Sequence, residues 1–222
     1  MTASSTCSDA SIPPVPRAGL IVLEGMPGAG KTTAAVALAS MGHSVVGEYT
    51  DDRDTTIAIS AHPGVGDDDG HQRNWLRKAA QCTARLASSP VVYADRDWLS
   101  SLSFAYCTAA ADAGALLTER AAWAERHLAD GTLLLPATYV VFDLDPDASL
   151  ARRAGRLRPG HPWNQPGALK RLRAFYRDPG QALRPASASL AAALSLPARL
   201  SVSGRDDPGA VLACLSSLAG PA

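Results

Sequence analysis

Short apolar runs rich in valine, leucine and isoleucine recur along the chain, each bounded by glycine, proline or polar residues. Such runs are typical of strands that are buried on both faces of a parallel sheet. They predict five strands, at residues 19–24, 44–49, 90–95, 138–144 and 199–203. Because these runs alternate with longer helical segments, we expect an α/β fold with helices on both faces of the sheet.

The segments between the strands divide into helices and loops. The predicted helices cover residues 31–41, 72–87, 99–113, 116–129, 148–157, 168–177 and 208–218. Residues 51–70 and 159–167 contain glycine and proline and predict loops, the first of them acidic and with room for one short helix. We expect a single domain over residues 18–222, preceded by a flexible leader at residues 1–17.

The composition excludes several classes of protein. The chain has 222 residues, of which 46% are hydrophobic, enough to fill a core. Its 21 basic and 21 acidic residues balance, so no overall field directs it to nucleic acid or to an anionic membrane. The four cysteines lie far apart, and no apolar run is long enough to cross a bilayer. We therefore expect a cytoplasmic protein with reduced thiols.

A phosphate-binding motif follows the first predicted strand directly. Residues 25–32 read Gly-Met-Pro-Gly-Ala-Gly-Lys-Thr and satisfy the pattern G-x-x-x-x-G-K-[ST] between a strand and a helix. Glycines let backbone N–H groups turn toward phosphate oxygens, and we expect Lys31 at the β- and γ-phosphates and Thr32 at Mg²⁺. The alternative is an ordinary glycine-rich turn. The residues expected to bind ATP here are Pro27, Gly28, Ala29, Gly30, Lys31, Thr32 and Thr33.

Two predicted strands end in carboxylates. Glu48, at the end of the second strand, is a candidate base for an attacking hydroxyl; the alternative is a solvated strand-end residue. Asp95, at the end of the third, is a candidate for orienting Mg²⁺ through water or for acting as the base. Arg96 is expected to neutralise charge on the transferring phosphoryl group, unless it only forms a structural ion pair with Asp95.

Basic residues gather after the fourth predicted strand. Four arginines follow it without an acid among them: Arg152, Arg153, Arg156 and Arg158. On a helix these four cannot all face one direction. We expect Arg152 and Arg156 to close on ATP from a lid at about residues 148–167, and Arg153 and Arg158 to be solvated. Arg205, after the last strand, is either a contact to adenine or part of a surface turn.

Flat side chains indicate where an acceptor would bind. The candidates for stacking on a flat acceptor are Trp75, Trp98, Phe104 and Tyr106, although aromatic residues on helices more often belong to the core. Arg53 is a further candidate contact to the acceptor. The acidic loop at 51–70 argues against a doubly charged acceptor beside it, unless its carboxylates stay in solvent. No histidine shows metal-ligand spacing, and we assign the histidines no role.

These motifs resemble those of the thymidylate kinase and deoxynucleoside kinase group of P-loop phosphotransferases. The segments similar to thymidylate kinase signatures are Glu24-Gly25, Thr32-Thr33, Asp95-Arg96 with Ser100-Ser101, and the arginine-rich segment after Asp143. Two features depart from thymidylate kinases, because Pro27 replaces an acid or arginine and no Arg-Glu-Pro follows the second strand. Glu48 is instead similar to the base of deoxynucleoside kinases, which leaves the acceptor open.

The resemblance implies a three-layer P-loop NTPase fold with an arginine-rich lid and a kinase that uses ATP and Mg²⁺. We expect transfer of the γ-phosphoryl group to a nucleoside or nucleotide-like acceptor. Two alternatives stay open: a phosphotransferase acting on a hydroxyl of another small molecule, such as an antibiotic, and an ATP-binding regulatory protein without an acceptor. The expected partner is the small-molecule acceptor, with neither nucleic acid nor membrane, and a homodimer stays open.

Overall fold

The computed structural model describes residues 15–108, 113–156 and 160–219. Residues 1–14 of the expected leader, and Arg158, lie outside the described residues. One five-stranded sheet forms, parallel throughout, in the order β2-β3-β1-β4-β5. Its strands are β1 (Arg17–Gly25), β2 (Ser44–Val46), β3 (Val92–Asp95), β4 (Pro136–Asp143) and β5 (Ala198–Ser203). The five predicted strands and the predicted fold class are confirmed.

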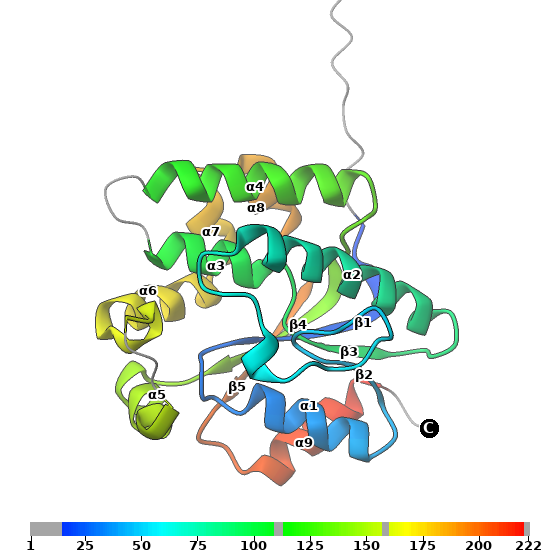
Figure 1. The fold of residues 1–222 in the computed structure, drawn as a ribbon. Coiled ribbons are helices and arrows are strands. Elements are labelled where there is room, and N and C mark those ends of the chain that lie inside the picture. Colours follow the sequence, from blue (N-terminus) through cyan, green and yellow to red (C-terminus); the bar gives the residue numbers. More distant parts are fainter. Residues whose placement is uncertain (1–14, 109–112, 157–159, 220–222) are drawn as a thin grey trace, which may run out of the picture.

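Helices lie on both faces of this sheet (Figure 1). On one face lie α1 (Lys31–Ser40) and α9 (Pro208–Ser217), and on the other lie α2 (Asp68–Leu86), α3 (Leu99–Thr108), α4 (Ala113–Ala129) and α6 (Pro166–Arg177). The remaining elements are α5 (Pro146–Arg153), α7 (Pro179–Leu183), α8 (Ala188–Ala193) and the 3₁₀ turns η1 (Ile59–Ala61), η2 (Ala154–Arg156) and η3 (Pro162–Asn164). Among the described residues, no helix is both long enough and apolar enough to cross a membrane.

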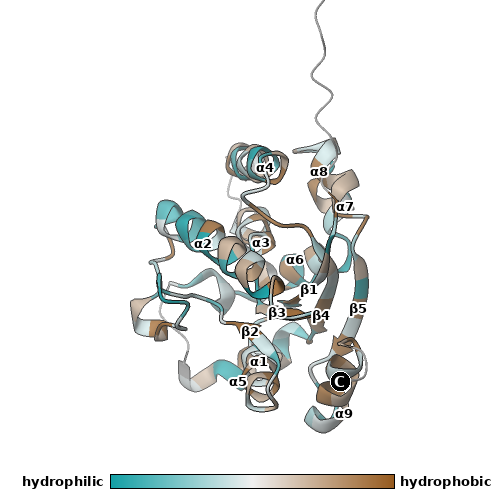
Figure 2. Ribbon diagram, turned by 90° about the vertical axis from the view of Figure 1, so that its right-hand side faces the viewer, coloured by the Kyte–Doolittle hydropathy of each residue, from teal (hydrophilic) through white to brown (hydrophobic). Residues whose placement is uncertain are grey.

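The central strand, β1, is deeply buried over its carboxyl-terminal half. Ile21, Val22 and Leu23 are each at most 4% exposed, and brown, apolar segments are seen on β1 and β4 in Figure 2. β1 pairs with β3 on one side and with β4 on the other. Because burial of apolar surface is the main stabilising term in folding, the end of β1 is a rigid support for whatever follows it.

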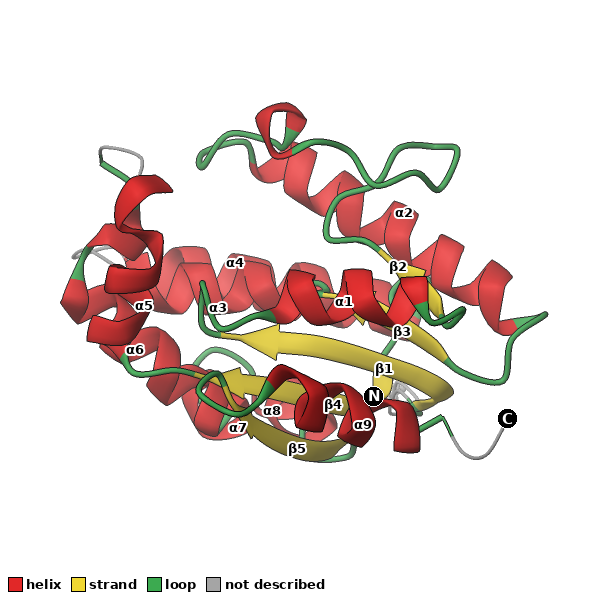
Figure 3. Cartoon of the chain, turned by 90° about the horizontal axis from the view of Figure 1, so that it is seen from below, coloured by secondary structure: helices red, strands yellow, loops and turns green. Residues whose placement is uncertain are grey.

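The carboxyl ends of the strands meet at one edge of the sheet. The arrowheads of β1 and β4 point to the end of the molecule where α5 and α6 lie (Figure 3). After β3 the chain passes from one side of β1 to the other, since β2 and β3 lie on one side and β4 and β5 on the other. In α/β folds a ligand binds at such a switch point, outside the carboxyl ends of the strands.

Four elements differ from the sequence-based prediction. β2 ends at Val46, so Glu48 lies in the loop after the strand. α2 begins at Asp68, earlier than predicted, because the Asp67 side chain accepts a hydrogen bond from the Gly70 amide and caps the helix. The short helices α7 and α8 were not predicted; they form where Leu183 and Leu190 are buried, which local sequence does not reveal.

Candidate active site

Three glycines curl the loop between β1 and α1. Gly25, Gly28 and Gly30 have φ values of 122°, 73° and 104°, in the left-handed region. A Cβ atom at Gly25 would lie 2.3 Å from the carbonyl oxygen of Phe142, so a larger residue there would displace β4 or the loop. α1 begins directly after Gly30 without a side-chain cap on its first N–H groups. The loop and the helix start together form a cradle for an anion.

Lys31 is buried, and its ammonium group folds back over the loop. Its Nζ donates to the carbonyl oxygen of Met26 at 2.7 Å and to that of Gly25 at 3.1 Å. Burial, and next the charge of Arg96, lower the pKa of Lys31 to about 7. A triphosphate in the cradle would counter this effect, because it brings negative charge to the ammonium group.

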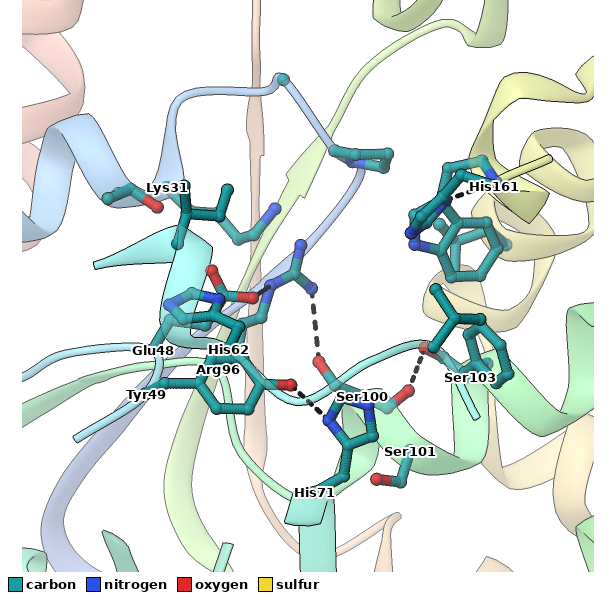
Figure 4. Close-up of a pocket in the computed structure, with 18 of the residues that line it drawn as sticks. Lys31, Glu48, Tyr49, His62, His71, Arg96, Ser100, Ser101, Ser103 and His161 are labelled. Carbon is teal, nitrogen blue, oxygen red and sulfur yellow. Dashed lines mark hydrogen bonds and ion pairs between the residues drawn. The ribbon is translucent and has the colours of Figure 1, made fainter. Parts of the chain in front are cut away.

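Arg96 joins two carboxylates at the centre of the site. Its Nε lies 2.9 Å from Oε1 of Glu48 (Figure 4), and its Nη1 lies 3.2 Å from Oε2 of Glu24. The Glu48 side chain is 30% exposed, whereas that of Glu24 is fully buried. Burial disfavours the charge of Arg96, but Glu48 and Glu24 outweigh it and raise the pKa of Arg96 above its usual value. Among the described residues Arg96 therefore pairs with these two glutamates and not with Asp95.

Glu24 is a residue of the site to which the sequence pattern assigned no role. Its carboxylate accepts hydrogen bonds from the hydroxyls of Ser100 at 2.7 Å and Tyr176 at 2.8 Å, and from the Asp97 amide at 3.2 Å. A buried carboxylate needs such donors, so Glu24 links β1 to the segment after β3 and to α6. The available signal was one acidic residue at the end of an apolar strand.

Thr32 and Asp95 are the residues expected near Mg²⁺. Thr32 lines the cavity at the start of α1. Asp95 is 1% exposed at the end of β3 and does not line the cavity, and its Oδ1 has no hydrogen-bond partner. A buried carboxylate oxygen without a donor is costly, and a nearby cation or its bound water would satisfy it. Hydroxyl and carboxylate oxygens are the donors that Mg²⁺ takes, so these two residues fit the ion.

A cavity of about 510 Å³ connects the phosphate cradle to a wall of aromatic side chains. Lys31 and Glu48 lie on one side of it, and His161 faces them from the segment between α5 and α6 (Figure 4). The aromatic side chains that line the cavity are Tyr49, His62, His71, Trp75, Phe104, His161, Trp163 and Tyr176. The cavity therefore has a polar donor end and a flat, largely aromatic acceptor end.

Tyr49 and His71 hold the loop that closes one side of the acceptor end. The Tyr49 hydroxyl lies 2.6 Å from His71 Nδ1, and His71 Nε2 lies 3.1 Å from the carbonyl oxygen of Gly64. Because a carbonyl only accepts, Nε2 carries the proton and Nδ1 accepts from Tyr49. Burial lowers the pKa of His71 and raises that of Tyr49, which keeps both groups neutral. The ring of His62 packs on Tyr49 with centroids 4.2 Å apart. Sequence reasoning assigned these histidines no role.

The structure brings most of the predicted site residues together. Those that line the cavity are Pro27, Gly28, Gly30, Lys31, Thr32, Thr33, Glu48, Trp75, Arg96 and Phe104. Trp98 does not line it: this side chain is 2% exposed in the core, and its Nε1 donates to the Leu134 carbonyl oxygen at 2.9 Å. Arg53 is also outside the cavity, because it lies exposed in the loop after β2. Stacking by Trp98 and acceptor binding by Arg53 are therefore not supported.

The arginines of the expected lid are arranged differently from the prediction. Arg153, expected in solvent, lines the cavity, and a Cβ atom on Gly28 would lie 3.2 Å from its Cγ. Arg152 is exposed outside the cavity and donates from Nη1 to the Gly28 carbonyl oxygen at 3.3 Å. The helix ends at Arg153 and Arg156 lies in η2, so the α-helical spacing of Arg152 and Arg156 does not apply. Arg205 is exposed in the turn after β5, and Ala29 does not line the cavity.

The acidic residues of the loop at 51–70 do not line the cavity, and most of them are engaged in local structure. Asp52 pairs with Arg77, and Asp54 pairs with Arg85. Asp67 caps α2, as described above, and Asp68 pairs with Arg120 of α4. The expected repulsion of a charged acceptor by this loop therefore loses its basis, because these carboxylates have structural partners.

The fold and the cradle define a P-loop nucleotide-binding protein. The chain belongs to a family described as AAA domain, whose sequence model matches residues 20–156. That match covers the phosphate loop, β3 and the first part of the lid segment. No curated protein matches the chain.

Solved structures of deoxyadenosine kinase from M. mycoides have a similar fold. The structure with bound dATP has a TM-score of 0.58 at 11% identity and covers 91% of this chain and 99% of that chain. The structure with the products dCMP and dCDP has a TM-score of 0.56 at 12% identity and covers 90% and 97%. At such low identity the likeness shows the fold alone. The predicted resemblance to the deoxynucleoside kinase group is confirmed at that level.

Proposed function

We propose that this protein is a kinase that uses ATP and Mg²⁺ to phosphorylate a hydroxyl group of a small, flat acceptor such as a nucleoside. The observation that supports this proposal is one continuous cavity with the phosphate cradle at one end and the aromatic wall at the other. Glu48 and Arg96 lie between the two ends and form an ion pair there. A protein that only bound ATP would not need the second, aromatic half of this cavity.

The reaction is a displacement at the γ-phosphorus. The acceptor oxygen forms a bond to phosphorus, the bond to the β–γ bridging oxygen breaks, ADP leaves, and the hydroxyl proton passes to Glu48. Glu48 is suited to this step because its carboxylate reaches the cavity and is held by Arg96 at 2.9 Å. Lys31 and Arg96 stabilise the charge that develops on the transferred group. When bound at Thr32 and Asp95, Mg²⁺ supplies further charge neutralisation.

The charges at the acceptor end favour a neutral acceptor over a monophosphate. Arg96 already pairs with Glu24 and Glu48. Arg120, another cation that lines the cavity, pairs with Asp68 and lies 5.4 Å from the Phe104 ring centroid. A phosphate group would have to compete with these carboxylates for Arg96 or Arg120, whereas an uncharged ring would not.

A second candidate acceptor is a larger hydroxyl compound, such as an antibiotic. The observation that favours it is an apolar rim at the cavity, where Ile59 is 70% exposed and Val65 is 45% exposed. An acceptor with an apolar part beyond its ring would cover these side chains, because burial removes them from water.

An acceptor panel tests the proposal. ADP formation is measured with ATP, Mg²⁺ and, in turn, nucleosides, nucleoside monophosphates and hydroxylated antibiotics. We expect ADP formation to depend on a nucleoside and a phosphorylated nucleoside to appear by mass spectrometry. Stimulation by an antibiotic alone would support the second candidate. ATP binding without stimulation by any acceptor would support the regulatory protein and contradict the kinase.

A further inference from the structure

Polar side chains of α2 hold the segment that carries Glu48. Asn74 Nδ2 donates to the Glu48 carbonyl oxygen at 3.1 Å, and Asn74 Oδ1 accepts from the Thr50 amide at 3.2 Å. Farther along the helix, Arg85 Nη1 donates to the Val45 carbonyl oxygen at 2.6 Å. In Figure 2, α2 shows long hydrophilic stretches although it packs on the sheet. These contacts give its polar residues a structural purpose, because they bind the backbone of residues 45–50.

Lys78 also binds this segment, but it differs from Asn74 and Arg85 because it is a cation that is fully buried. It is 2% exposed, and among the described residues no carboxylate pairs with it. Its Nζ donates to the carbonyl oxygen of Gly47 at 2.6 Å and also to that of Asp95. It also lies 5.9 Å from the ring centroid of Trp75, which lines the cavity. Burying an ammonium group is costly, and burial lowers the pKa of Lys78. The two hydrogen bonds that Lys78 donates are therefore made at a cost in the stability of the fold.

The two carbonyl groups that Lys78 holds belong to the peptide units before Glu48 and before Arg96. The Asp95–Arg96 unit is held on both sides, since its oxygen accepts from Lys78 and its N–H donates to the Leu23 carbonyl oxygen at 3.0 Å. These bonds fix the plane of that peptide unit. Arg96 has a φ of 68°, a left-handed conformation that is unfavourable for a residue with a side chain. Such a conformation persists only where the surroundings enforce it.

We propose that Lys78 is a positioning residue that aligns Arg96 with Glu48. One ammonium group ties together the two peptide units that precede the members of the central ion pair. The effect on catalysis rests on the proposed kinase function, but the alignment is a property of the protein without substrate. Loss of the ammonium group would leave the Asp95–Arg96 peptide unit held on one side alone, by its N–H bond to Leu23, and would let Arg96 leave its left-handed conformation.

The Arg96 side chain provides a test that does not depend on activity. In the ¹⁵N-labelled full chain without substrate, the Nε–H of Arg96 should give a resolved, slowly exchanging NMR signal, because this side chain is only 17% exposed and its Nε forms an ion pair with Glu48 at 2.9 Å. Its assignment follows from its absence in Arg96→Lys. We expect the signal to be lost in Lys78→Met. The matched control is Arg85→Met. This change removes the hydrogen bond to the Val45 carbonyl oxygen on the same segment but no contact to either of the two peptide units, so it should keep the signal. An unchanged Arg96 signal in Lys78→Met overturns the proposal.

The second test measures steady-state kinetics with the acceptor that the panel identifies. Misplacement of a reacting group by about 1 Å costs about 100-fold in rate, so Lys78→Met should lower kcat by about 100-fold. The KM for ATP should stay unchanged, and Lys78→Arg, which keeps donors at this position, should recover part of the loss. An unchanged kcat in Lys78→Met beside an active wild type contradicts the proposal.

The NMR test and the kinetic test together distinguish a failure of the proposed function from a failure of the positioning role. If the wild type phosphorylates no acceptor but Lys78→Met loses the Arg96 signal, the proposed function fails and the positioning role stands. If circular dichroism shows that Lys78→Met does not fold, Lys78→Gln takes its place, because its shorter amide reaches at most one of the two carbonyl oxygens. A retained Arg96 signal in Lys78→Gln then overturns the proposal.

Discussion

The donor end and the acceptor end of the cavity are built in different ways. The donor end comes from one continuous stretch, residues 25–33, in which glycines shape the backbone and Lys31 and Thr32 add the side-chain chemistry. The acceptor end comes from α2, α3, α4, α6, the loop after β2 and the segment between α5 and α6, and its chemistry is carried by side chains. A backbone cradle suits a ligand part common to all nucleotides, whereas a wall of side chains can vary with the acceptor.

The largest expected effect is at the donor end. Lys31→Ala removes the ammonium group at the β- and γ-phosphates, and loss of such a charge donor should lower turnover by about 1,000-fold. The melting temperature should be close to that of the wild type, because a buried and costly charge is removed. Lys170→Ala, at an exposed position of α6, is the control and should keep full turnover. Turnover near the wild-type level in Lys31→Ala would contradict the assignment of the donor end.

The second largest effect is expected at Glu48, where the donor end and the acceptor end of the cavity meet. Glu48→Gln keeps the shape of the side chain but cannot take a proton, so kcat for a hydroxyl acceptor should fall by about 100-fold. The KM for ATP should change little, because Glu48 faces the acceptor. Initial rates against both substrates measure this, with Asp52→Asn in the same exposed loop as control. An equal loss for hydroxyl and phosphate acceptors would remove Glu48 from the role of base.

A smaller effect is expected at the acceptor end alone. Phe104→Leu removes a ring that packs edge-on against Trp163 at 5.7 Å, and the KM for the acceptor should rise by about tenfold. The KM for ATP should not change. Tyr106→Leu on the same helix is the control, because Tyr106 packs on Phe175 and does not line the cavity. A rise in the KM for ATP in Phe104→Leu would show that the two ends are not separate.

The smallest effect concerns protonation at the donor end. Because the pKa of Lys31 is lowered to about 7, most of this amine is neutral in the empty protein at pH 8. A bound triphosphate favours the charged form, so ATP binding should take up close to one proton at pH 8. Affinity should therefore fall as pH rises from 7 toward 10. Calorimetry in buffers of different ionisation enthalpy measures the uptake, which should vanish in Lys31→Arg. No uptake by the wild type at pH 8 would contradict the lowered pKa.

The different construction of the donor and acceptor ends explains which parts of the site were predictable from the sequence. The phosphate loop was recognised because its residues are consecutive and their backbone requirement appears as glycine. Glu48 and Arg96 were recognised as polar residues at strand ends, but their pairing with each other and with Glu24 depends on neighbouring strands. His62 and His71 were assigned no role because their position on the cavity wall follows from the path of the loop after β2, not from local spacing.

The arginines of α5 show the same limit of prediction from local sequence. Arg152 and Arg153 are neighbours on α5 with equal charge, but only Arg153 lines the cavity. In the same way Trp75 lines the cavity while Trp98 belongs to the core, although both are tryptophans near polar segments. Neighbouring residues of a helix point about 100° apart, so which of them faces the cavity depends on how the helix packs in the fold.

By itself the sequence determined the α/β class, the five strands and the phosphate loop of this protein. Those features follow from hydrophobic periodicity and from glycine, which act over a few neighbouring residues. Only the tertiary structure decided that Lys78 joins the peptide units of Gly47 and Asp95, that Glu24 gathers donors from three elements, and that aromatic side chains from α2, α3 and α6 share one cavity. The physical reason is that each of these contacts joins residues far apart in the chain, which meet only when the sheet order places their elements side by side.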